Sequence, residues 1–212
     1  MLKAHKRTLI LTSILTILPI LVGVYYWDLL PDPMATHFGA LGEANGYSSK
    51  AFAVFGLPLF LLAMLHLLAL VTAKDPKRQN ISSKLFRLVL WIIPFVSLVA
   101  YVSIYSFNLG YDLDIIRMME ILMGVLFLVI GNYLPKTRQS YTLGIRIPWT
   151  LSSEENWNRT HRFAGFLWVM AGIVVILLSI ANVLSARWFT IIFFAIALVP
   201  CLYSFAIYEK GK

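Results

Sequence analysis

Cysteine and charge are both scarce in this chain of 212 residues. The single cysteine, Cys201, excludes an internal disulfide and any metal site built from several cysteines. Only 13% of the residues are charged while 59% are hydrophobic, and this composition lies outside the soluble globular class. A phosphate-binding glycine loop is also missing, which argues against an ATP-driven pump. These absences indicate a membrane protein without a cysteine-based or nucleotide-dependent site.

Long apolar runs dominate what is present. Six of them reach the roughly 20 helical residues that are needed to cross a hydrocarbon core about 30 Å thick. The expected helical spans are 8–27, 52–73, 85–107, 115–134, 163–184 and 188–208. The first run lacks a small-residue cleavage site, so we expect it to be retained and not removed as a secretory signal. The predicted fold class is an all-α integral membrane protein with six transmembrane helices.

The distribution of Lys and Arg predicts the orientation, because cytoplasmic loops retain positive charge. Of the 18 basic residues, three (Lys50, Arg117 and Arg187) fall on one side of the predicted membrane. The others fall on the side that carries both termini, so both termini are expected in the cytoplasm. Topology and attraction to anionic lipid headgroups then explain the formal net charge of +8. No direct contact with nucleic acid is predicted.

A single six-helix membrane domain, residues 1–212, is expected, because six spans leave few residues for another domain and no internal repeat is visible. One half, 1–107, contains a loop at 28–51, which is predicted to face outward and is called the outer loop. The other half, 108–212, contains a loop at 135–162, which is predicted to face the cytoplasm and is called the inner loop.

The outer loop is expected to be compact, because prolines end the first span and the Asn45-Gly46 pair favours a turn. A metal site formed by His37 with Asp32 or Glu43 is one interpretation of its side chains. No second histidine lies nearby, so a hydrogen-bonded structural histidine is favoured and no metal site is predicted.

The inner loop is polar in a chain that is otherwise mostly apolar. Its segment Ser152-Ser153-Glu154-Glu155 fits a capping box with Ser152 as the N-cap and Glu155 three positions later. A helix is therefore predicted to begin at this point, after an extended stretch that Pro148 closes.

If that helix continues, Trp157, His161, Gly165 and Trp168 fall near one face at spacings of four, four and three. Such a stripe would bring two indoles and an imidazole together close to the membrane interface. The competing interpretation is an aromatic belt in the lipid headgroups, where Trp is favoured. An aromatic belt would explain the tryptophans, but it would not explain why polar and basic residues lie between positions 137 and 150.

Two runs carry a family resemblance. GNYLPKTRQSYTLGIR followed by PWTLSSEENWNRTHRF resembles the carboxy-terminal signature of the SdpI (SdpI/YfhL) family of bacterial membrane immunity proteins. LPDPMATHFGALGEANGYSSK resembles the amino-terminal signature, in which Leu-Pro precedes His-Phe or His-Trp and a glycine-rich stretch ends at Ser-Lys. Asn45 stands where family members often have Asp. Together with the span pattern, the resemblance covers nearly the whole chain.

The resemblance implies a protein of the bacterial cell (plasma) membrane that protects its producer from a secreted antimicrobial peptide toxin. It also implies signalling by membrane sequestration of an ArsR-type autorepressor. The predicted topology places the toxin at the outer loop and the cytosolic repressor at the inner loop. No catalytic residue and no cofactor are predicted, and the chain is not expected to be an enzyme.

The positions that match the inner signature are expected to form a binding surface: Asn132, Tyr133, Pro135, Lys136, Arg138, Tyr141, Gly144, Arg146, Pro148, Trp149, Ser153, Glu155, Trp157, Thr160 and His161. The outer signature supplies a second set: Pro31, His37, Phe38, Gly42, Ser49 and Lys50.

The alternative function is an intramembrane enzyme, or a small-solute or proton transporter, that uses His66 or the Arg138–His161 surface. Ionisable groups within spans are costly and usually functional. For His66 we favour a neutral side chain hydrogen-bonded to a neighbouring helix. For Glu120 the simplest expectation is a salt bridge to Arg117, one turn earlier.

Two further patterns leave their alternatives open. Ser153, Glu155 and His161 could be drawn as a catalytic set, but the capping box already gives this segment a structural role. Three small residues in the spans permit close helix packing: Gly124, Gly165 and Gly172. The packing partner could be another helix of this chain or a second copy in a homo-oligomer.

Overall fold

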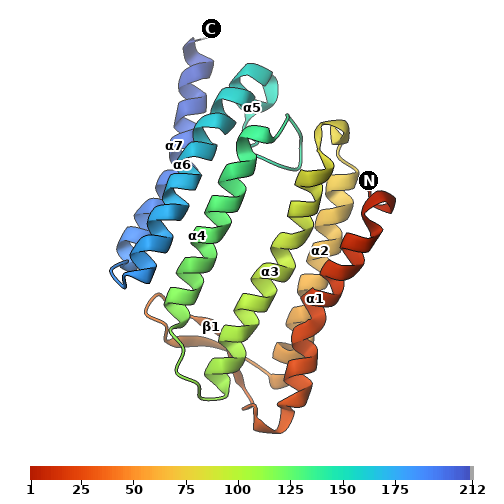
Figure 1. The fold of residues 1–212 in the computed structure, drawn as a ribbon, viewed down its shortest axis with the longest axis vertical. Coiled ribbons are helices and arrows are strands. Elements are labelled where there is room, and N and C mark those ends of the chain that lie inside the picture. Colours follow the sequence, from red (N-terminus) through yellow and green to blue (C-terminus); the bar gives the residue numbers. More distant parts are fainter. Residues whose placement is uncertain (211–212) are drawn as a thin grey trace. The chain divides into compact units, whose positions relative to one another are not determined.

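The computed structural model describes residues 1–210 (Figure 1), so Lys212, one of the predicted cytoplasmic charges, lies outside the described part. Within it, six helices are long and apolar enough to cross a membrane, which confirms the predicted fold class. The long helices are α1 (Lys6–Tyr25), α2 (Leu57–Ala73), α3 (Ser83–Asn108), α4 (Ile115–Tyr133), α6 (Glu154–Ile180) and α7 (Ala186–Lys210). The shorter elements are α5 (Pro148–Ser152) and an antiparallel hairpin of β1 (Met34–Phe38) and β2 (Ala44–Ser48).

The helix surfaces fit a lipid environment. Apolar side chains along α7 are exposed, among them Phe194, Leu198 and Leu202, the last of which is 67% exposed. A soluble monomer rarely leaves so large a continuous apolar surface in water. The chain is therefore a multi-pass membrane protein.

Helix α6 begins at Glu154, close to the predicted helix start in the inner loop, and continues without a break into the span predicted from residue 163. The outer loop is compact as expected, but it contains the β1–β2 hairpin, which the sequence did not predict.

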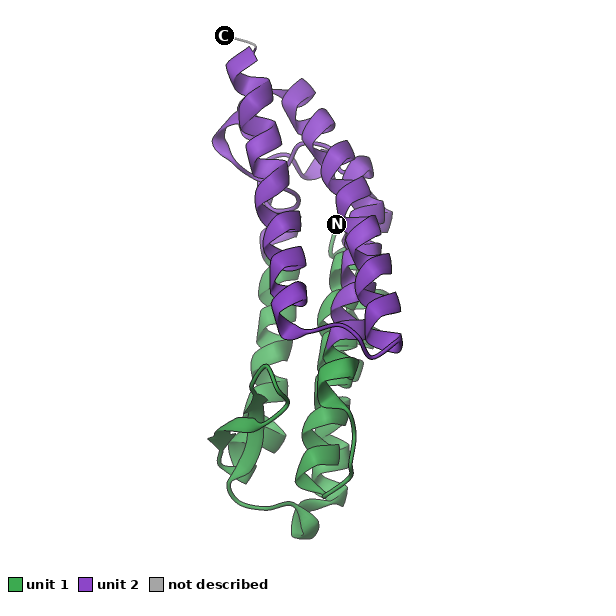
Figure 2. Cartoon of the chain, turned by 90° about the vertical axis from the view of Figure 1, so that its left-hand side faces the viewer, with its two compact units in different colours: residues 1–70, 87–119 green, residues 71–86, 120–212 purple. Residues whose placement is uncertain are grey.

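The chain divides into two compact units (Figure 2). Unit 1 comprises Met1–Leu70 and Arg87–Met119, and it holds α1, the hairpin, most of α2 and most of α3. Unit 2 comprises Val71–Phe86 and Glu120–Lys212, and it holds most of α4, all of α5 and α6, and α7, together with the connection between α2 and α3; the first turn of α4 belongs to unit 1. The outer loop lies in unit 1 and the inner loop in unit 2.

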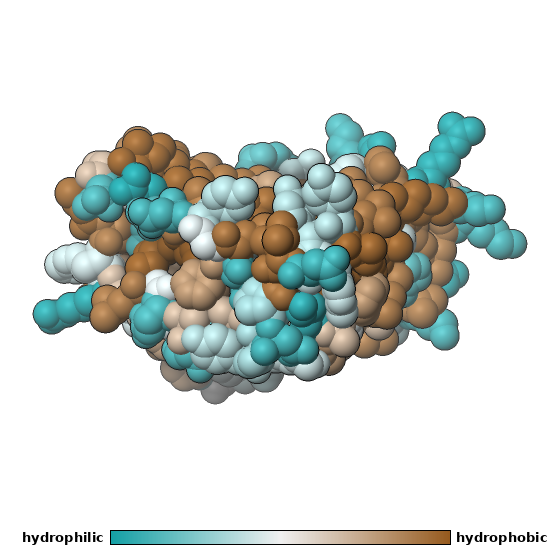
Figure 3. Space-filling view, turned by 90° about the horizontal axis from the view of Figure 1, so that it is seen from below, coloured by the Kyte–Doolittle hydropathy of each residue, from teal (hydrophilic) through white to brown (hydrophobic). Residues whose placement is uncertain are grey.

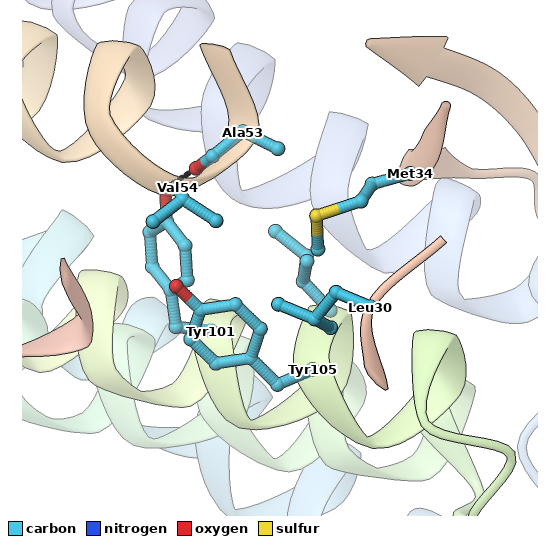
Figure 4. Close-up of a cluster of buried hydrophobic side chains, with 7 residues drawn as sticks. Leu30, Met34, Ala53, Val54, Tyr101 and Tyr105 are labelled. Atoms are coloured by element: carbon cyan, nitrogen blue, oxygen red, sulfur yellow. Dashed lines mark hydrogen bonds between the residues drawn. The ribbon is translucent and has the colours of Figure 1, made fainter. Parts of the chain in front are cut away.

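The core of unit 1 joins the hairpin to the helices (Figure 4). Leu30 and Met34 enter a buried cluster with residues of α3 and of the π-helical turn Phe52–Gly56. The Tyr101 hydroxyl donates to the Ala53 carbonyl (2.7 Å). Asn108 fastens the hairpin to α3, because its side chain both accepts from the Ala35 N–H and donates to the Ala35 carbonyl, each at 2.9 Å.

Replacing Tyr101 with Phe is expected to lower the free energy of unfolding by about 1 kcal/mol, the usual scale for one buried hydrogen bond in a membrane protein. The ring keeps its packing, while the Ala53 carbonyl loses the hydroxyl that donates to it. Titration with SDS in mixed micelles measures the change. No loss of stability would contradict a contribution from this hydrogen bond.

Close glycine contacts pack α4 against α6 within unit 2. A Cβ on Gly124 would lie 3.1 Å from the Gly172 carbonyl oxygen, and one on Gly131 would lie 3.0 Å from the Gly165 carbonyl oxygen. The two helix backbones therefore approach closely at both levels. The predicted close packing of these small residues thus occurs inside the chain, between α4 and α6.

The ionisable groups in the spans differ from the sequence prediction. Glu120 does not pair with Arg117; its carboxylate accepts from the Ser179 hydroxyl (2.8 Å), while Arg117 pairs with Asp114 (3.2 Å). His66 is exposed, and its Nδ1 contacts the Leu62 carbonyl of its own helix (2.9 Å) and not a neighbouring helix. Both expected pairings were wrong: a serine of α6 supplies the donor to Glu120, and the carbonyl one turn earlier in the same helix contacts His66.

Candidate functional site

The start of α6 positions most of the inner-loop residues. Ser153, and not Ser152, is the N-cap: its hydroxyl accepts from the Asn156 N–H (3.2 Å), while Ser152 ends the short helix α5. The predicted capping box is therefore wrong by one residue. Glu155 instead pairs with Arg159 (3.2 Å) in the first turns of α6, on the exposed side.

Trp157 and His161 form the centre of the inner loop. Their rings stack with centroids 4.0 Å apart, and the Trp157 indole N–H donates to the Thr137 carbonyl (2.9 Å). His161 Nδ1 lies 2.8 Å from the Trp157 carbonyl, and its Nε2 accepts from the Ile145 N–H (2.9 Å). The backbone amide thus fixes a neutral imidazole that carries its proton on Nδ1.

Both side chains are buried, Trp157 completely, so the aromatic-belt interpretation is wrong for Trp157. The helical stripe is confirmed for this pair of residues. Further along α6, the Trp168 indole N–H donates to the Ile196 carbonyl of α7 (2.8 Å). Trp157 therefore packs inside the protein, while Trp168 is half-buried and tied to α7.

Gly144 closes over the stacked pair. Its φ of +106° lies in the region that favours glycine. A Cβ at this position would lie 2.5 Å from His161 Nε2 and 2.9 Å from two carbons of the Trp157 indole. The turn therefore fits against the aromatic pair only because Gly144 has no side chain.

Gln139 joins three segments of unit 2. Its side-chain amide donates to the carbonyls of Thr150 (2.9 Å) and Leu151 (2.8 Å), two consecutive residues of α5. Its side-chain oxygen accepts from Lys77 Nζ, and its backbone carbonyl accepts from Asn80 (2.8 Å). Sequence reasoning did not select Gln139, although it lies inside the recognised run.

Asp75 is a second residue that sequence reasoning missed. It lies in the connection between α2 and α3 and is buried, and one carboxylate oxygen accepts from both the Tyr141 N–H (2.9 Å) and the Thr142 hydroxyl (2.7 Å). The other oxygen accepts from the Lys77 N–H (2.7 Å). A single acidic residue in a basic segment was the signal that could have identified it.

Basic side chains remain exposed on the inner loop. Lys136 donates to Asn132 (3.1 Å) and lies over the Tyr133 ring, and Arg146 donates to the Tyr141 carbonyl (2.8 Å). Arg138 is exposed, with no hydrogen bond or ion pair to its side chain among residues 1–210. Lys136, Arg138 and Arg146 are thus three exposed basic residues of the inner loop; we call them the basic inner surface.

The remaining inner positions support the framework. Pro135 packs against Gly165, and Pro148 begins α5. Thr160 donates to the Asn156 side chain (3.0 Å), which also binds Ser204 of α7. Trp149 lies against two aromatic rings of α7, those of Phe205 and Tyr208.

His37 of the outer loop is exposed and pairs with Asn45 across the hairpin, with 2.6 Å between His37 Nδ1 and Asn45 Oδ1. This is the structural hydrogen bond that the sequence favoured, and the amide oxygen of Asn45 serves without a carboxylate. Asp32 accepts from the Lys50 N–H (3.0 Å), and Glu43 from the Leu41 N–H (3.1 Å). Among residues 1–210 no three His, Cys, Asp or Glu side chains lie close enough to hold a metal ion.

The other matched positions of the outer loop close it. Lys50 Nζ donates to the Trp27 carbonyl (3.1 Å) and lies over the Trp27 ring, which ties the end of the loop to its start. Phe38 packs edge-on against Phe107 of α3 (5.0 Å between centroids), and the Ser49 hydroxyl accepts from the Phe52 N–H (3.4 Å). Pro31 is exposed next to the cis Asp32–Pro33 bond, and Gly42 forms the hairpin tip with a φ of +83°.

The three inner-loop residues that could be drawn as a catalytic set each have a structural partner. The hydroxyl of Ser153 caps α6, Glu155 pairs with Arg159, and both ring nitrogens of His161 are occupied by backbone groups. These three residues therefore do not form the nucleophile, base and orienting group of a catalytic set. Each loop instead presents exposed polar side chains over residues that are hydrogen-bonded within the fold, which is an arrangement suited to binding.

Comparison with known proteins places these loops in a family context. Residues 136–206 match the model of the SdpI/YfhL protein family. The chain is also 24% identical over 174 residues, which is 80% of each chain, to the protein named Immunity protein SdpI of Bacillus subtilis (strain 168). The resemblance to the SdpI/YfhL family is confirmed.

The SdpI/YfhL match begins inside the inner loop and includes Trp157, His161 and all of α6. A second model, described as a domain of unknown function (DUF1648), matches residues 14–62 and so contains the whole outer loop. No solved structure matches the chain.

Proposed function

We propose that this protein is an immunity protein of the bacterial plasma membrane, which protects the producing cell from a secreted antimicrobial peptide toxin. The observation that carries the proposal is the similarity to Immunity protein SdpI over 80% of both chains, together with the SdpI/YfhL match at the inner loop. The predicted orientation gives the toxin access to the outer loop.

The second part of the proposal is signalling through an ArsR-type autorepressor held at the membrane by the basic inner surface. Lys136, Arg138 and Arg146 are exposed there, so a repressor with an acidic patch would be complementary. The outer and inner loops belong to different compact units, which supports separate binding of toxin and repressor.

The enzyme or transporter alternative has less support. His66 is exposed and bonded to its own helix, and His161 has no free nitrogen for proton exchange. Neither histidine therefore has the arrangement that a buried proton path requires.

Survival of a toxin-sensitive Gram-positive strain that expresses this chain tests the proposal. Cells are challenged with secreted peptide toxin from related bacteria, and a fluorescent ArsR-type repressor reports recruitment to the membrane. We expect His37→Ala to reduce survival at least about tenfold and leave recruitment intact, because it removes the cross-strand pairing at the hairpin. Arg146→Ala is expected to reduce recruitment and spare survival.

Matched membrane levels and one further variant make the result interpretable. His66→Ala replaces another exposed histidine and should leave both readouts unchanged. Protection that fails only in His66→Ala would favour the transporter alternative. No protection by the parent protein against any toxin tried, with correct insertion, would refute immunity.

A further inference from the structure

A cleft in unit 1 lies between the tip of the hairpin and the connection from α3 to α4. Its volume is about 460 Å³. The hairpin contributes Leu41 and Gly42, the end of α3 contributes Phe107, and residues 110–116 form the rest of the wall. Figure 3 looks onto the end of the molecule that carries the hairpin, where apolar and polar side chains are intermixed at the surface.

Gly42 is the only residue of this wall that the family signature had selected. A Cβ on Gly42 would lie 3.2 Å from Cγ1 of Ile116, so the hairpin tip is seated against the first turn of α4. The hairpin tip and the start of α4 therefore lie in contact on one side of the cleft.

Several apolar side chains at the cleft are exposed. Leu41 is 83% exposed, and Tyr111 and Leu113 are exposed as well. Such side chains gain free energy by contact with an apolar partner, at about 25 cal/mol for each Å² that leaves water. The cleft thus offers apolar side chains that no other part of residues 1–210 covers.

The charge at the cleft is negative. Asp114 is paired with Arg117 and accepts from the Arg117 N–H (2.9 Å), so its charge is largely compensated. Asp112 is exposed, and its carboxylate makes no hydrogen bond or ion pair within residues 1–210. An uncompensated carboxylate beside exposed leucines complements a ligand that is both apolar and cationic.

We propose that this cleft binds an amphipathic, cationic peptide segment. An apolar side chain of the peptide contacts Leu41 and Leu113, and a lysine or arginine next to it pairs with Asp112. This inference rests on the proposed immunity function and names the docking site of the toxin on the outer loop.

Peptide binding to the purified protein in phosphatidylcholine nanodiscs tests the site directly. The probes are a fluorescent amphipathic peptide of leucine and lysine and a matched peptide of leucine and glutamate, and empty nanodiscs give the lipid background. We expect the leucine–lysine peptide to bind above that background and the leucine–glutamate peptide not to bind. Equal binding of the two peptides, or binding no stronger than to empty nanodiscs, would overturn the proposal.

Two charge-reversal variants locate the binding. Asp112→Lys should raise the Kd of the leucine–lysine peptide at least about tenfold, because it replaces attraction by repulsion. Asp28→Lys makes the same charge change at another exposed acid on the predicted outer side, away from the cleft, and should change the Kd less than about twofold. Leu41→Ala should weaken binding at constant charge. Equal effects of the two reversals would refute the site.

The survival assay separates this inference from the proposed function. If the parent protein protects cells and Asp112→Lys protects them equally well, the proposed binding site in the cleft is refuted while the immunity function stands. Leucine–lysine binding that depends on Asp112, in a protein that protects against no toxin, would support the cleft and overturn immunity.

Discussion

Gly144→Ala is expected to lower the free energy of unfolding by about 3 kcal/mol. A non-glycine residue with positive φ costs roughly 1–2 kcal/mol, and inserting a methyl group into a packed site costs typically about 1–3 kcal/mol more. Both terms apply, because φ is +106° and the new Cβ would lie 2.5 Å from His161 Nε2. Unfolding by SDS in mixed micelles, followed by tryptophan fluorescence, measures the loss.

Gly110→Ala is the matched control for Gly144→Ala. Its φ of +80° imposes backbone strain, but no atom lies within 4 Å of the added Cβ. We expect a loss of about 1–2 kcal/mol from strain alone. If the two variants lose the same stability, the contact of Gly144 with Trp157 and His161 is not a constraint on the inner loop.

The loss at Gly144 should extend to function under the proposed model. A displaced turn would break the hydrogen bond from the Ile145 N–H to His161 and move Arg146, the next residue along the chain. Repressor recruitment should therefore fall together with stability. Toxin protection should fall less, since the outer loop belongs to the other compact unit.

The six spans could be predicted from sequence because the length and hydropathy of an apolar run are local properties. The side-by-side placement of loops was also partly predictable. The charge pattern assigned the connection around Asp75 and the inner loop to the same side, and these two segments do bind each other in unit 2. The face of the membrane on which they lie stays a prediction.

The hairpin escaped prediction for a physical reason. MATHF and ANGYS lack the alternating apolar pattern that marks a half-buried strand, and Asn, Gly and Ala are poor strand formers. Their pairing is stabilised from outside, by the core around Met34 and by the double hydrogen bond from Asn108 to Ala35. Tertiary contacts of this kind cannot be read from local propensity.

The start of α6 was predicted one residue too early because two neighbouring serines are both suitable N-cap residues. Ser152 and Ser153 are both good N-cap residues, and only Ser152 has a Glu three positions later. The structure instead uses Ser152 to complete α5, which Gln139 holds through the carbonyls of Thr150 and Leu151. A contact from outside the segment thus decides which serine begins α6.

Asp75→Ala is expected to release the inner loop from the connection between α2 and α3. The carboxylate accepts from Lys77, Tyr141 and Thr142, and hydrogen bonds to charged groups contribute roughly 1.5–3 kcal/mol each. Because part of that energy is recovered when water reaches the freed donors, we expect a net loss of about 3 kcal/mol. Asp75→Asn should lose less, since it keeps one acceptor oxygen.

Trypsin cleavage at Lys136, Arg138 and Arg146 measures the release in membrane vesicles. Cleavage should be at least about tenfold faster in Asp75→Ala than in the parent protein, as expected for a few kcal/mol of lost local stability. Glu154→Ala removes an exposed acid of the inner loop and should leave the rate unchanged. Cleavage only in inside-out vesicles would support the predicted cytoplasmic orientation. Equal rates in the parent and Asp75→Ala would show that Asp75 does not hold the loop.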